Sequence, residues 1–326
     1  MGFGTVGRWL ARALAERYAD RFQIVGLANR RDGFFYREDG IDLGAALAIA
    51  AEDRSLDALP DVARWSTAIE GMRASDADVL VEVTQSPPPE GEPGRSHLAE
   101  ALERGIPAVM SNKWPIAIHG VALAELARRQ SAFLRAESCV MSGTPVLSTL
   151  SEGLAGATPL AIRGVLNATA NYILSDMARG QSYADALAAA QNEGLAERDA
   201  SADVDGHDAV AKAMVLSAVV FGRQLALEDV SRTGISSVTE EAVSQALSEG
   251  RRVREVTTVE GSVARVEPVA LEADDPLARI EGTDNAVLCR AEPLGQVMVV
   301  GPGAGVELAG QGVLSDLLQT AARASS

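Results

Sequence analysis

The chain opens with a glycine motif that leads directly into a helical pattern. Gly2, Gly4 and Gly7 follow the spacing G-x-G-x-x-G, and the apolar residues after them recur at helical intervals. Glycines at this spacing let the backbone approach a pyrophosphate at the N-terminus of a helix. The motif therefore predicts a doubly wound α/β domain that binds a dinucleotide. The expected contacts come from Gly2, Phe3, Gly4, Thr5, Val6 and Gly7.

The strand that should precede this motif is missing, because Met1 stands immediately before Gly2. In a parallel sheet such a strand is central and covered on both faces, so its loss would expose the interior of the sheet. We expect the native start to lie upstream of Met1, through a misplaced start codon or trimming of the chain.

The next predicted strand, Phe22 to Ala28, bears on the choice of cofactor. NAD-binding sites usually place an acidic residue at the end of this strand to bind the ribose hydroxyls. The sequence has Asn29, Arg30 and Arg31 there instead. Guanidinium groups suit a 2′-phosphate, so the sequence favours NADP over NAD. The alternative is that both arginines are only solvated.

A proline-rich loop follows the predicted strand Asp78 to Val83. It begins at Thr84 and lies at the carboxyl end of a parallel strand, the edge at which such sheets hold ligands. Ser96 is the expected N-cap of the next helix, which should end before Gly105. His97 and His119 receive no functional interpretation.

The next predicted strand begins at Pro107 and runs directly into Lys113. The sequence then predicts a helix from His119 to Gln130.

Lysine is rare in this chain. Of 29 basic residues only Lys113 and Lys212 are lysines. Arginine cannot release a proton near neutral pH, whereas a desolvated lysine can act as an acid or a base. Asp208 and Lys212 stand at i and i+4 of an apolar helical pattern and should share one face. The alternative is a chance pair of surface lysines.

In the second half of the sequence, the predicted helices come before the predicted strands. Helical patterns at Ala170 to Arg179, Ser182 to Glu193 and Thr239 to Glu249 precede four alternating stretches. Those stretches predict strands of one antiparallel sheet.

Three segments carry a resemblance to a known family. They read N-A-T-A-N-Y-I-L-S-D-M from Asn167, A-L-A-A-A-Q-N-E-G-L-A-E-R-D from Ala186 and D-V-D-G-H-D-A-V-A-K from Asp203. Together they closely resemble the signature of homoserine dehydrogenase, and the resemblance covers nearly the whole chain. It implies a Rossmann-type domain plus an α+β substrate and dimerisation domain with a mainly antiparallel sheet. We expect residues 1–136 and 301–326 in the first domain and 137–300 in the second.

The resemblance also implies a reaction and its site residues. The expected activity is NADP-dependent hydride transfer between L-aspartate 4-semialdehyde and L-homoserine, in threonine and methionine biosynthesis. Either lysine is a candidate for proton transfer, and Lys113 also lies between nicotinamide and substrate. Asp208 would orient Lys212 or bind the substrate amine. For Asp203 two interpretations are open: a substrate ligand, or a carboxylate that is only solvated. The remaining implied contacts are Glu197 and Gly194 for the substrate, and Thr84, Gly303 and Gly305 for the cofactor.

A monovalent cation is a further expectation, because the segment E-S-C-V-M-S-G-T-P resembles one that wraps such an ion through backbone oxygens. The matching residues are Glu137, Val140, Ser142 and Thr144.

Two features keep other functions open. Ala168 and Ala170 depart from the family pattern N-G-T-T-N, which leaves a related amino-acid or aldehyde dehydrogenase as an alternative. The missing first strand supports a second alternative, a catalytically silent paralogue that only binds a dinucleotide.

Composition limits the partners. A net charge of −16 disfavours nucleic acid and anionic membranes, which require a basic surface. Cys139 and Cys289 cannot form a disulfide framework, and no apolar run is long enough for a membrane span. We therefore expect a cytoplasmic enzyme, paired as a homodimer as in the family, without an appended regulatory domain. The acidic excess favours a salt-loving source, with a G+C-rich genome as the alternative.

Overall fold

The computed structural model describes residues 1–324, which divide into two compact units. The first unit comprises Met1–Ser138 together with the chain from Gly305 onward, and the second comprises Cys139–Ala304. Each unit has its own sheets and its own apolar cores.

The first unit contains two three-stranded sheets. One is antiparallel, in the order β1 (Gly26–Asn29), β2 (Gly33–Tyr36), β3 (Ala63–Trp65). The other is parallel, in the order β4 (Leu80–Glu82), β5 (Ala108–Met110), β6 (Leu134–Arg135). The sequence did not predict β2 or β3. It also placed the start of β1 at Phe22, which is wrong: the carbonyls of Ile24 and Val25 accept from Ile41 and Arg37 outside the regular ladder.

The first residues of the chain make contact with both of these sheets. The Met1 amino group donates to the Val81 carbonyl at 2.6 Å, and the Val83 N–H donates to the Met1 carbonyl at 3.0 Å. The Gly2 and Phe3 N–H groups both donate to the Ala28 carbonyl, at 3.0 and 2.9 Å. The first three residues therefore connect the two sheets through backbone hydrogen bonds.

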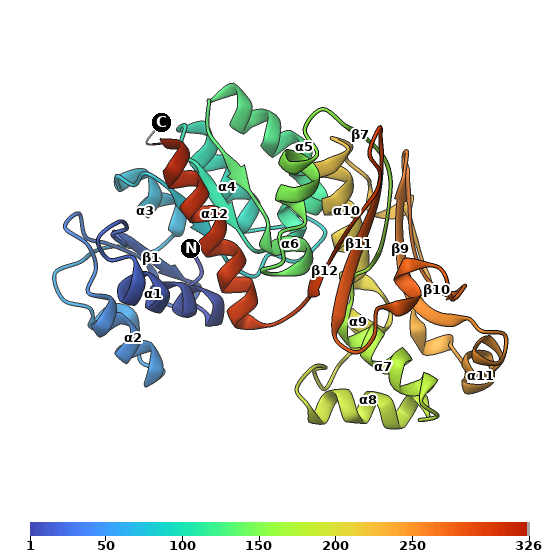
Figure 1. Ribbon diagram of the computed structural model, residues 1–326. Coiled ribbons are helices and arrows are strands. Elements are labelled where there is room, and N and C mark those ends of the chain that lie inside the picture. The colour runs from blue at the N-terminus through green and yellow to red at the C-terminus, as the bar shows by residue number, and fades with distance from the viewer. Residues whose placement is uncertain (325–326) are drawn as a thin grey trace. The chain divides into compact units, whose positions relative to one another are not determined.

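Six helices complete the first unit: α1 (Thr5–Arg17), α2 (Leu43–Ala51), α3 (Ala68–Ala74), α4 (Gly94–Glu103), α5 (Lys113–Arg129) and α12 (Val306–Ala324). Helix α12 lies beside α1 (Figure 1), and Leu10 and Leu14 share an apolar cluster with Val313 and Leu317. The C-terminal helix therefore belongs to the first unit, although the second unit separates it from the rest in sequence.

Two predicted helix starts in the first unit are wrong. Helix α4 begins at Gly94 with Pro93 at the N-cap position, so Ser96 lies inside its first turn. Helix α5 begins at Lys113, six residues before the expected start at His119, and the Asn112 side chain caps it by accepting from the Trp114 N–H at 3.3 Å. Proline is compatible with a first turn because the N–H it lacks would have no helical partner there.

The second unit is built on a six-stranded sheet in the order β12-β11-β7-β9-β10-β8. Every neighbouring pair is antiparallel except β8 and β10, which confirms the mainly antiparallel sheet. The strands are β7 (Thr158–Val165), β8 (Val230–Arg232), β9 (Arg252–Glu260), β10 (Val263–Leu271), β11 (Asp284–Glu292) and β12 (Gly295–Pro302). The helices are α6 (Ser138–Met141), α7 (Ala168–Ala178), α8 (Tyr183–Asn192), α9 (Ser201–Val204), α10 (His207–Val220) and α11 (Glu240–Ser248).

The two faces of this sheet have different neighbours. Val253 of β9 shares a cluster with Ile173 of α7 and Val243 of α11, so its side chain is on the helix-covered face. Val256 of β9 belongs instead to a cluster with Leu277, which lies in the 3-10 turn Pro276–Arg279. Because side chains alternate along a strand, Glu255 and Thr257 lie on the helix-covered face with Val253.

Candidate active site

A glycine turn sets the position of the α10 lysine. Gly206 links α9 to α10 with φ +78°, a conformation that other residues rarely adopt. A Cβ at this position would lie 3.2 Å from the Val266 side chain. Helix α10 starts directly after the turn, so Asp208 stands in its first turn and Lys212 one turn later.

Lys212 and Asp208 form a largely buried ion pair. The Lys212 Nζ lies 2.8 Å from Asp208 Oδ2 and donates to the Leu166 carbonyl at 2.5 Å. The lysine side chain is only 8% exposed and that of the aspartate 19% exposed. The expected i and i+4 pairing is present, and Lys212 is not a surface lysine. A desolvated amine of this kind can exchange a proton with a substrate hydroxyl.

Asp203 lies close to the start of α7. The Asn167 Nδ2 donates to Asp203 Oδ1 at 2.9 Å, while its Oδ1 caps α7 by accepting from the Ala170 N–H at 2.8 Å. Ala168 and Ala170, which depart from the family pattern, are both buried, and Ala170 belongs to the α7 core cluster. At Ala170 the difference is therefore accommodated as core packing.

Glu197 and Gly194 lie on the loop after α8. The Glu197 side chain is exposed and makes no hydrogen bond or ion pair within the described residues, although its carbonyl accepts from Gln191 Nε2 at 3.2 Å. Gly194 has φ +74° and ends the helix. The structure thus connects Asp203 to Asn167 and Asp208 to Lys212, and leaves the Glu197 carboxylate facing solvent.

The glycine motif at the start of α1 fits a dinucleotide. A Cβ at Gly2 would lie 2.7 Å from the Val83 carbonyl group, and one at Gly7 would lie 2.2 Å from the Gly2 carbonyl oxygen. These two glycines are therefore required by close backbone packing. A Cβ at Gly4 would meet nothing within 4 Å, and Gly4 provides no side-chain cap for α1. The N–H groups of the first turn, from Thr5 to Gly7, are therefore available to a phosphate.

The loop after β1 contains an acidic residue that sequence reasoning missed. Asp32 Oδ2 accepts from the Asn29 side chain at 2.8 Å and from the Leu56 N–H at 3.1 Å, and Oδ1 accepts from the Ser55 hydroxyl at 2.8 Å. Burial alone raises the pKa of Asp32, but these hydrogen bonds and one from Arg31 outweigh it and lower the pKa to about 2. Asp32 therefore holds the loop together.

The two arginines expected to bind phosphate differ in their surroundings. Arg31 is held in place: its guanidinium contacts Asp32 Oδ1 at 3.1 Å and donates to the carbonyls of Asp53 and Arg54. Arg30 is exposed and has no hydrogen bond or ion pair among the described residues. Of the two, Arg30 has the guanidinium that an incoming ligand could bind without breaking a contact.

A buried polar cluster follows β4. Glu82 is fully buried, its Oε2 lies 2.6 Å from His97 Nδ1, and its Oε1 accepts from the Thr84 N–H at 2.7 Å. Burial is the largest effect and opposes ionisation, but the hydrogen bonds with His97 and Thr84 and the charge of the Met1 amino group together outweigh it, so the pKa of Glu82 is lowered. One feature of the sequence points to this missed pair: a carboxylate inside the apolar strand D-V-L-V-E-V needs a partner.

Asn112 joins this cluster to the second lysine. Its Nδ2 donates to the Thr84 carbonyl at 2.5 Å, and it caps the helix whose first residue is Lys113. Lys113 therefore does not end a strand, as the sequence suggested, but stands at a helix N-terminus. The partial positive charge there repels an ammonium.

The residues expected to hold a cation have other contacts. The Glu137 N–H donates to Asp316 Oδ2 at 2.8 Å, and the side chain of Val140 is buried. The Ser142 and Thr144 hydroxyls donate to the carbonyls of Gly303 and Pro302, at 3.1 and 3.0 Å. In the part of the chain that the structure describes, no group of three or more His, Cys, Asp or Glu residues is arranged to bind a metal.

The glycines expected near the cofactor, Gly303 and Gly305, have different constraints. A Cβ at Gly303 would lie 2.2 Å from Asn285 Cγ, so close packing in the second unit requires glycine there. Gly305 has φ +135° just before α12, a conformation that only glycine adopts readily.

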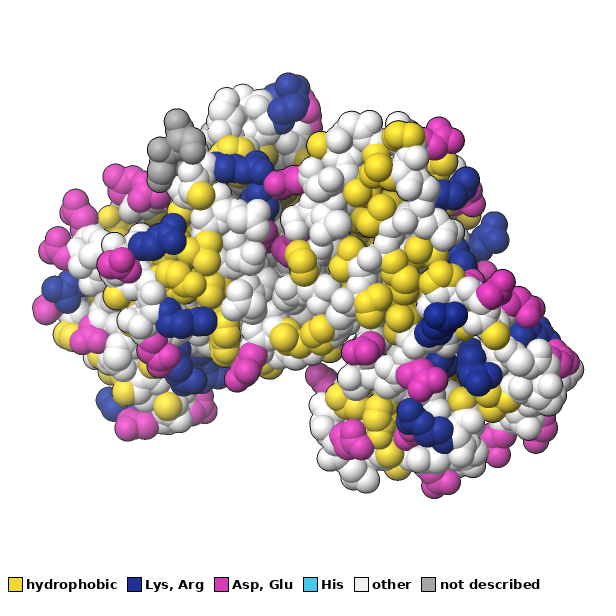
Figure 2. All heavy atoms as spheres, in the orientation of Figure 1, with side chains coloured by type: hydrophobic (Ala, Val, Ile, Leu, Met, Phe, Trp, Pro, Cys, Tyr) yellow, Lys and Arg dark blue, Asp and Glu magenta, His cyan; other side chains and the backbone are white. Residues whose placement is uncertain are grey.

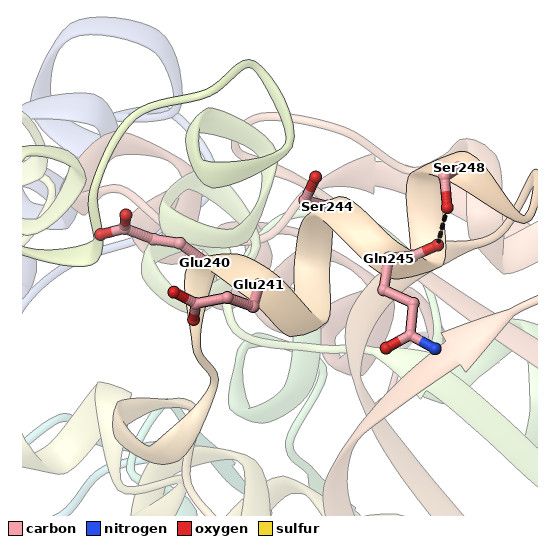
Figure 3. Close-up of a pocket in the computed structure, with 5 residues that line it drawn as sticks. All are labelled: Glu240, Glu241, Ser244, Gln245 and Ser248. Atoms are coloured by element: carbon pink, nitrogen blue, oxygen red, sulfur yellow. Dashed lines mark hydrogen bonds between the residues drawn. The ribbon is translucent and has the colours of Figure 1, made fainter.

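A shallow depression on α11 is less suited to catalysis than the site at α10. All five lining residues come from this one helix (Figure 3), and the Ser248 hydroxyl donates to the Gln245 carbonyl at 2.8 Å. Glu240 and Glu241 lie in the first turn, where carboxylates interact favourably with the helix dipole. The depression contains none of the buried charged groups found at α10.

Comparison with known families gives a consistent result over both halves of the chain. The sequence model described as "Homoserine dehydrogenase, NAD binding domain" matches residues 2–137, and the one described as "Homoserine dehydrogenase" matches residues 145–318. Together the two matches include the glycine motif, both lysines and the α9–α10 turn.

Individual relatives match almost end to end. The NAD(+)-dependent homoserine dehydrogenase of Pseudomonas canavaninivorans is 36% identical, covering 98% of this chain and 94% of the relative. The homoserine dehydrogenase of Methanocaldococcus jannaschii is 32% identical, covering 98% and 96%. A solved hyperthermophilic archaeal homoserine dehydrogenase in complex with NADPH superimposes with a TM-score of 0.84 at 32% identity, over 99% of this chain and 96% of that one.

Within residues 1–324, no helix is both long enough and apolar enough to cross a bilayer.

Proposed function

The chain belongs to the homoserine dehydrogenase family, and from this premise we propose that Lys212, held by Asp208, exchanges the proton of the reaction. The enzyme is an NAD(P)-dependent oxidoreductase that interconverts L-aspartate 4-semialdehyde and L-homoserine. The bound nicotinamide supplies the hydride chemistry. The observation that carries the proposal is the buried contact of 2.8 Å between Lys212 and Asp208.

The surroundings of Lys212 suit proton exchange in both directions. A neutral amine accepts the hydroxyl proton when homoserine is oxidised, and the ammonium returns it when the semialdehyde is reduced. Asp208 and the Leu166 carbonyl fix the nitrogen in one place, which reduces the entropic cost of aligning it with the substrate. Asp203, Glu197 and Gly194 are proposed to bind the amino-acid end, since carboxylates pair well with an ammonium.

Lys113 is the competing candidate for the same role. It belongs to the first unit, next to the loop that holds Thr84, and an ammonium there would stabilise negative charge on the substrate oxygen. The two assignments differ in which substitution abolishes proton transfer.

The deciding experiment is homoserine oxidation, followed through the absorbance of the reduced cofactor. We expect Lys212→Ala to lower kcat by about 10³-fold with cofactor affinity unchanged, and Lys113→Ala to retain more of kcat. Lys212→Arg is the matched control, because it keeps the charge but cannot release a proton near neutral pH. Near-wild-type kcat in Lys212→Ala would transfer the role to Lys113. A folded wild type that binds cofactor without turnover would instead support a catalytically silent paralogue.

NADP is the proposed preferred cofactor. The support is Arg30, whose exposed guanidinium follows β1 and can meet a 2′-phosphate, while Arg31 is occupied by Asp32. One relative is named as NAD(+)-dependent and another was solved with NADPH, so both cofactors occur among the similar proteins. NAD remains the alternative substrate in the assay.

A monovalent cation is proposed at Glu137, Val140, Ser142 and Thr144, where backbone carbonyls would be the ligands. Its test is the thermal unfolding temperature in potassium chloride against that in tetramethylammonium chloride at equal ionic strength. No difference between the two salts would remove the cation from the proposal.

A homodimer is proposed through the face of the six-stranded sheet that the helices leave open. Val300 of β12 and Val263 of β10 point to this face and are 51% and 47% exposed. Apolar side chains gather over this sheet in Figure 2. Exposed apolar side chains on a sheet face are typical of an interface.

The cellular setting is also a proposal. Cys289 is buried and forms no disulfide, which suits the reducing cytoplasm. The net charge of −16 suits a salt-rich interior, in which a dense layer of carboxylates stays hydrated.

A further inference from the structure

A buried carboxyl group lies beneath the proposed catalytic pair. Glu255 of β9 is 2% exposed, and its side chain lies on the helix-covered face of the sheet. Neither of its carboxyl oxygens has a hydrogen-bond partner among the described residues. A buried carboxylate without partners is costly, so this position needs an explanation beyond packing.

The surroundings of Glu255 place it at the α9–α10 turn. Its Oε2 lies 3.4 Å from the position that a Gly206 Cβ would take. Three charged groups act on it electrostatically: Asp208 and Lys212 from α10, and Asp203 from α9. On its own strand, the Thr257 hydroxyl is also buried without a partner.

The other nearby charges are directed elsewhere. The guanidinium of Arg232, the last residue of β8, donates to the Asp205 carbonyl. Arg254, next to Glu255 on β9, lies on the opposite face and donates to the Ala278 carbonyl. The residue paired with Glu255 on β10 is Pro268, which has no charge. The charges that face Glu255 are therefore two carboxylates and one ammonium.

These surroundings favour the neutral acid. Burial is the largest effect and raises the pKa of Glu255, Asp208 and Asp203 also raise it, and Lys212 opposes them, so that the net pKa is about 8. At neutral pH the carboxyl group is therefore mostly protonated, and it ionises in the alkaline range.

We propose that Glu255 is a positioning residue whose protonation sets the charge around the Asp208–Lys212 pair. When Glu255 is protonated, Lys212 is balanced by Asp208 alone and can exchange its proton with the substrate. When Glu255 ionises, a further carboxylate faces the ammonium and holds its proton more tightly. The inference rests on the proposed role of Lys212, and it locates a control of that role in the sheet below the helix.

The two-lysine composition allows a direct test in the full-length protein. Lysine labelled with ¹³C at Cε gives one NMR signal from Lys113 and one from Lys212. We expect the Lys212 signal of the wild type to show a step near pH 8 that is absent from the Lys113 signal. Glu255→Gln should remove this step. Glu260→Gln should keep it, because Glu260 is on the same strand but is 63% exposed and paired with Arg290.

Kinetics give a second readout that a purely structural role would not change. In homoserine oxidation, the pH at which kcat reaches half its maximum should be lower in Glu255→Gln by about one unit, with KM unchanged. Glu260→Gln should match the wild type.

Three outcomes would overturn the inference: a wild-type Lys212 signal without the alkaline step, a step that persists in Glu255→Gln, or an unchanged kcat profile. If Glu255→Gln does not fold, the wild-type titration alone decides. The NMR result does not depend on turnover, so a wild type that shows the step but does not oxidise homoserine contradicts only the proposed function.

Discussion

Lys212 illustrates how partners from separate segments define the chemistry of one residue. Asp208 comes from its own helix, the Leu166 carbonyl from the residue that follows β7, and Glu255 from β9 below. The helix supplies only the first of these. The other two depend on how the chain packs α10 onto the sheet.

Asp32 gives a prediction about stability and pH. Its folded pKa, about 2, lies below the ordinary value of 3.8, so its contribution is present above pH 4 and is lost as the pH falls toward 2. Asp32→Asn should lower the free energy of unfolding by about 2 kcal/mol at pH 7, and the difference should shrink between pH 4 and pH 2. Urea unfolding at several pH values measures it. The control is Asp53→Asn, whose side chain is fully exposed; an equal loss there would contradict the assignment.

Arg30 gives a prediction about cofactor choice. If its guanidinium binds the 2′-phosphate, Arg30→Ala should lower kcat/KM for NADP by about tenfold or more and leave that for NAD nearly unchanged. Arg21→Ala, another exposed arginine that precedes β1, is the control. If the ratio of kcat/KM for NADP to kcat/KM for NAD is the same in Arg30→Ala as in the wild type, another residue determines the cofactor preference.

The start of α1 gives a prediction at the scale of one element. Gly4→Ala adds a Cβ that touches no protein atom, so thermal unfolding should be almost unchanged while NADPH binding weakens by about tenfold. Gly7→Ala instead pushes a Cβ against the Gly2 carbonyl and should lower the unfolding temperature as well. Cofactor fluorescence titration and calorimetry separate the two effects. Unchanged NADPH affinity in Gly4→Ala would mean that the phosphate binds elsewhere.

The quaternary structure gives a prediction for the whole molecule. Val300→Asp places a charge on the open face of the sheet, and a buried unpaired carboxylate would cost several kcal/mol at an interface. Light scattering in molar salt should therefore give twice the monomer mass for the wild type and the monomer mass for the variant. Leu227→Asp is the control, since Leu227 is similarly exposed but lies in a 3-10 turn. A monomeric wild type would end the dimer proposal.

Local patterns in the sequence were enough to predict several features of the protein. The glycine spacing predicted the start of α1, and alternation predicted β9, β10, β11 and β12, because both depend on neighbouring residues. The scarcity of lysine directed attention to Lys212, and helical periodicity placed Asp208 beside it. The family and its reaction were also accessible, because the signature segments are local.

Tertiary structure decided what depends on distant segments. The pairing of Glu82 with His97, the contacts of Arg31 with the carbonyls of Asp53 and Arg54, and the burial of Glu255 each depend on segments that no local pattern relates. The starts of α4 and α5 were also missed: Pro93 stands at the N-cap position of α4 without a side-chain cap, and Asn112 caps α5 two residues after β5 ends. Local periodicity determines which elements form, because it depends on adjacent side chains. Packing determines which charges lose their water, and so which of them can take part in chemistry.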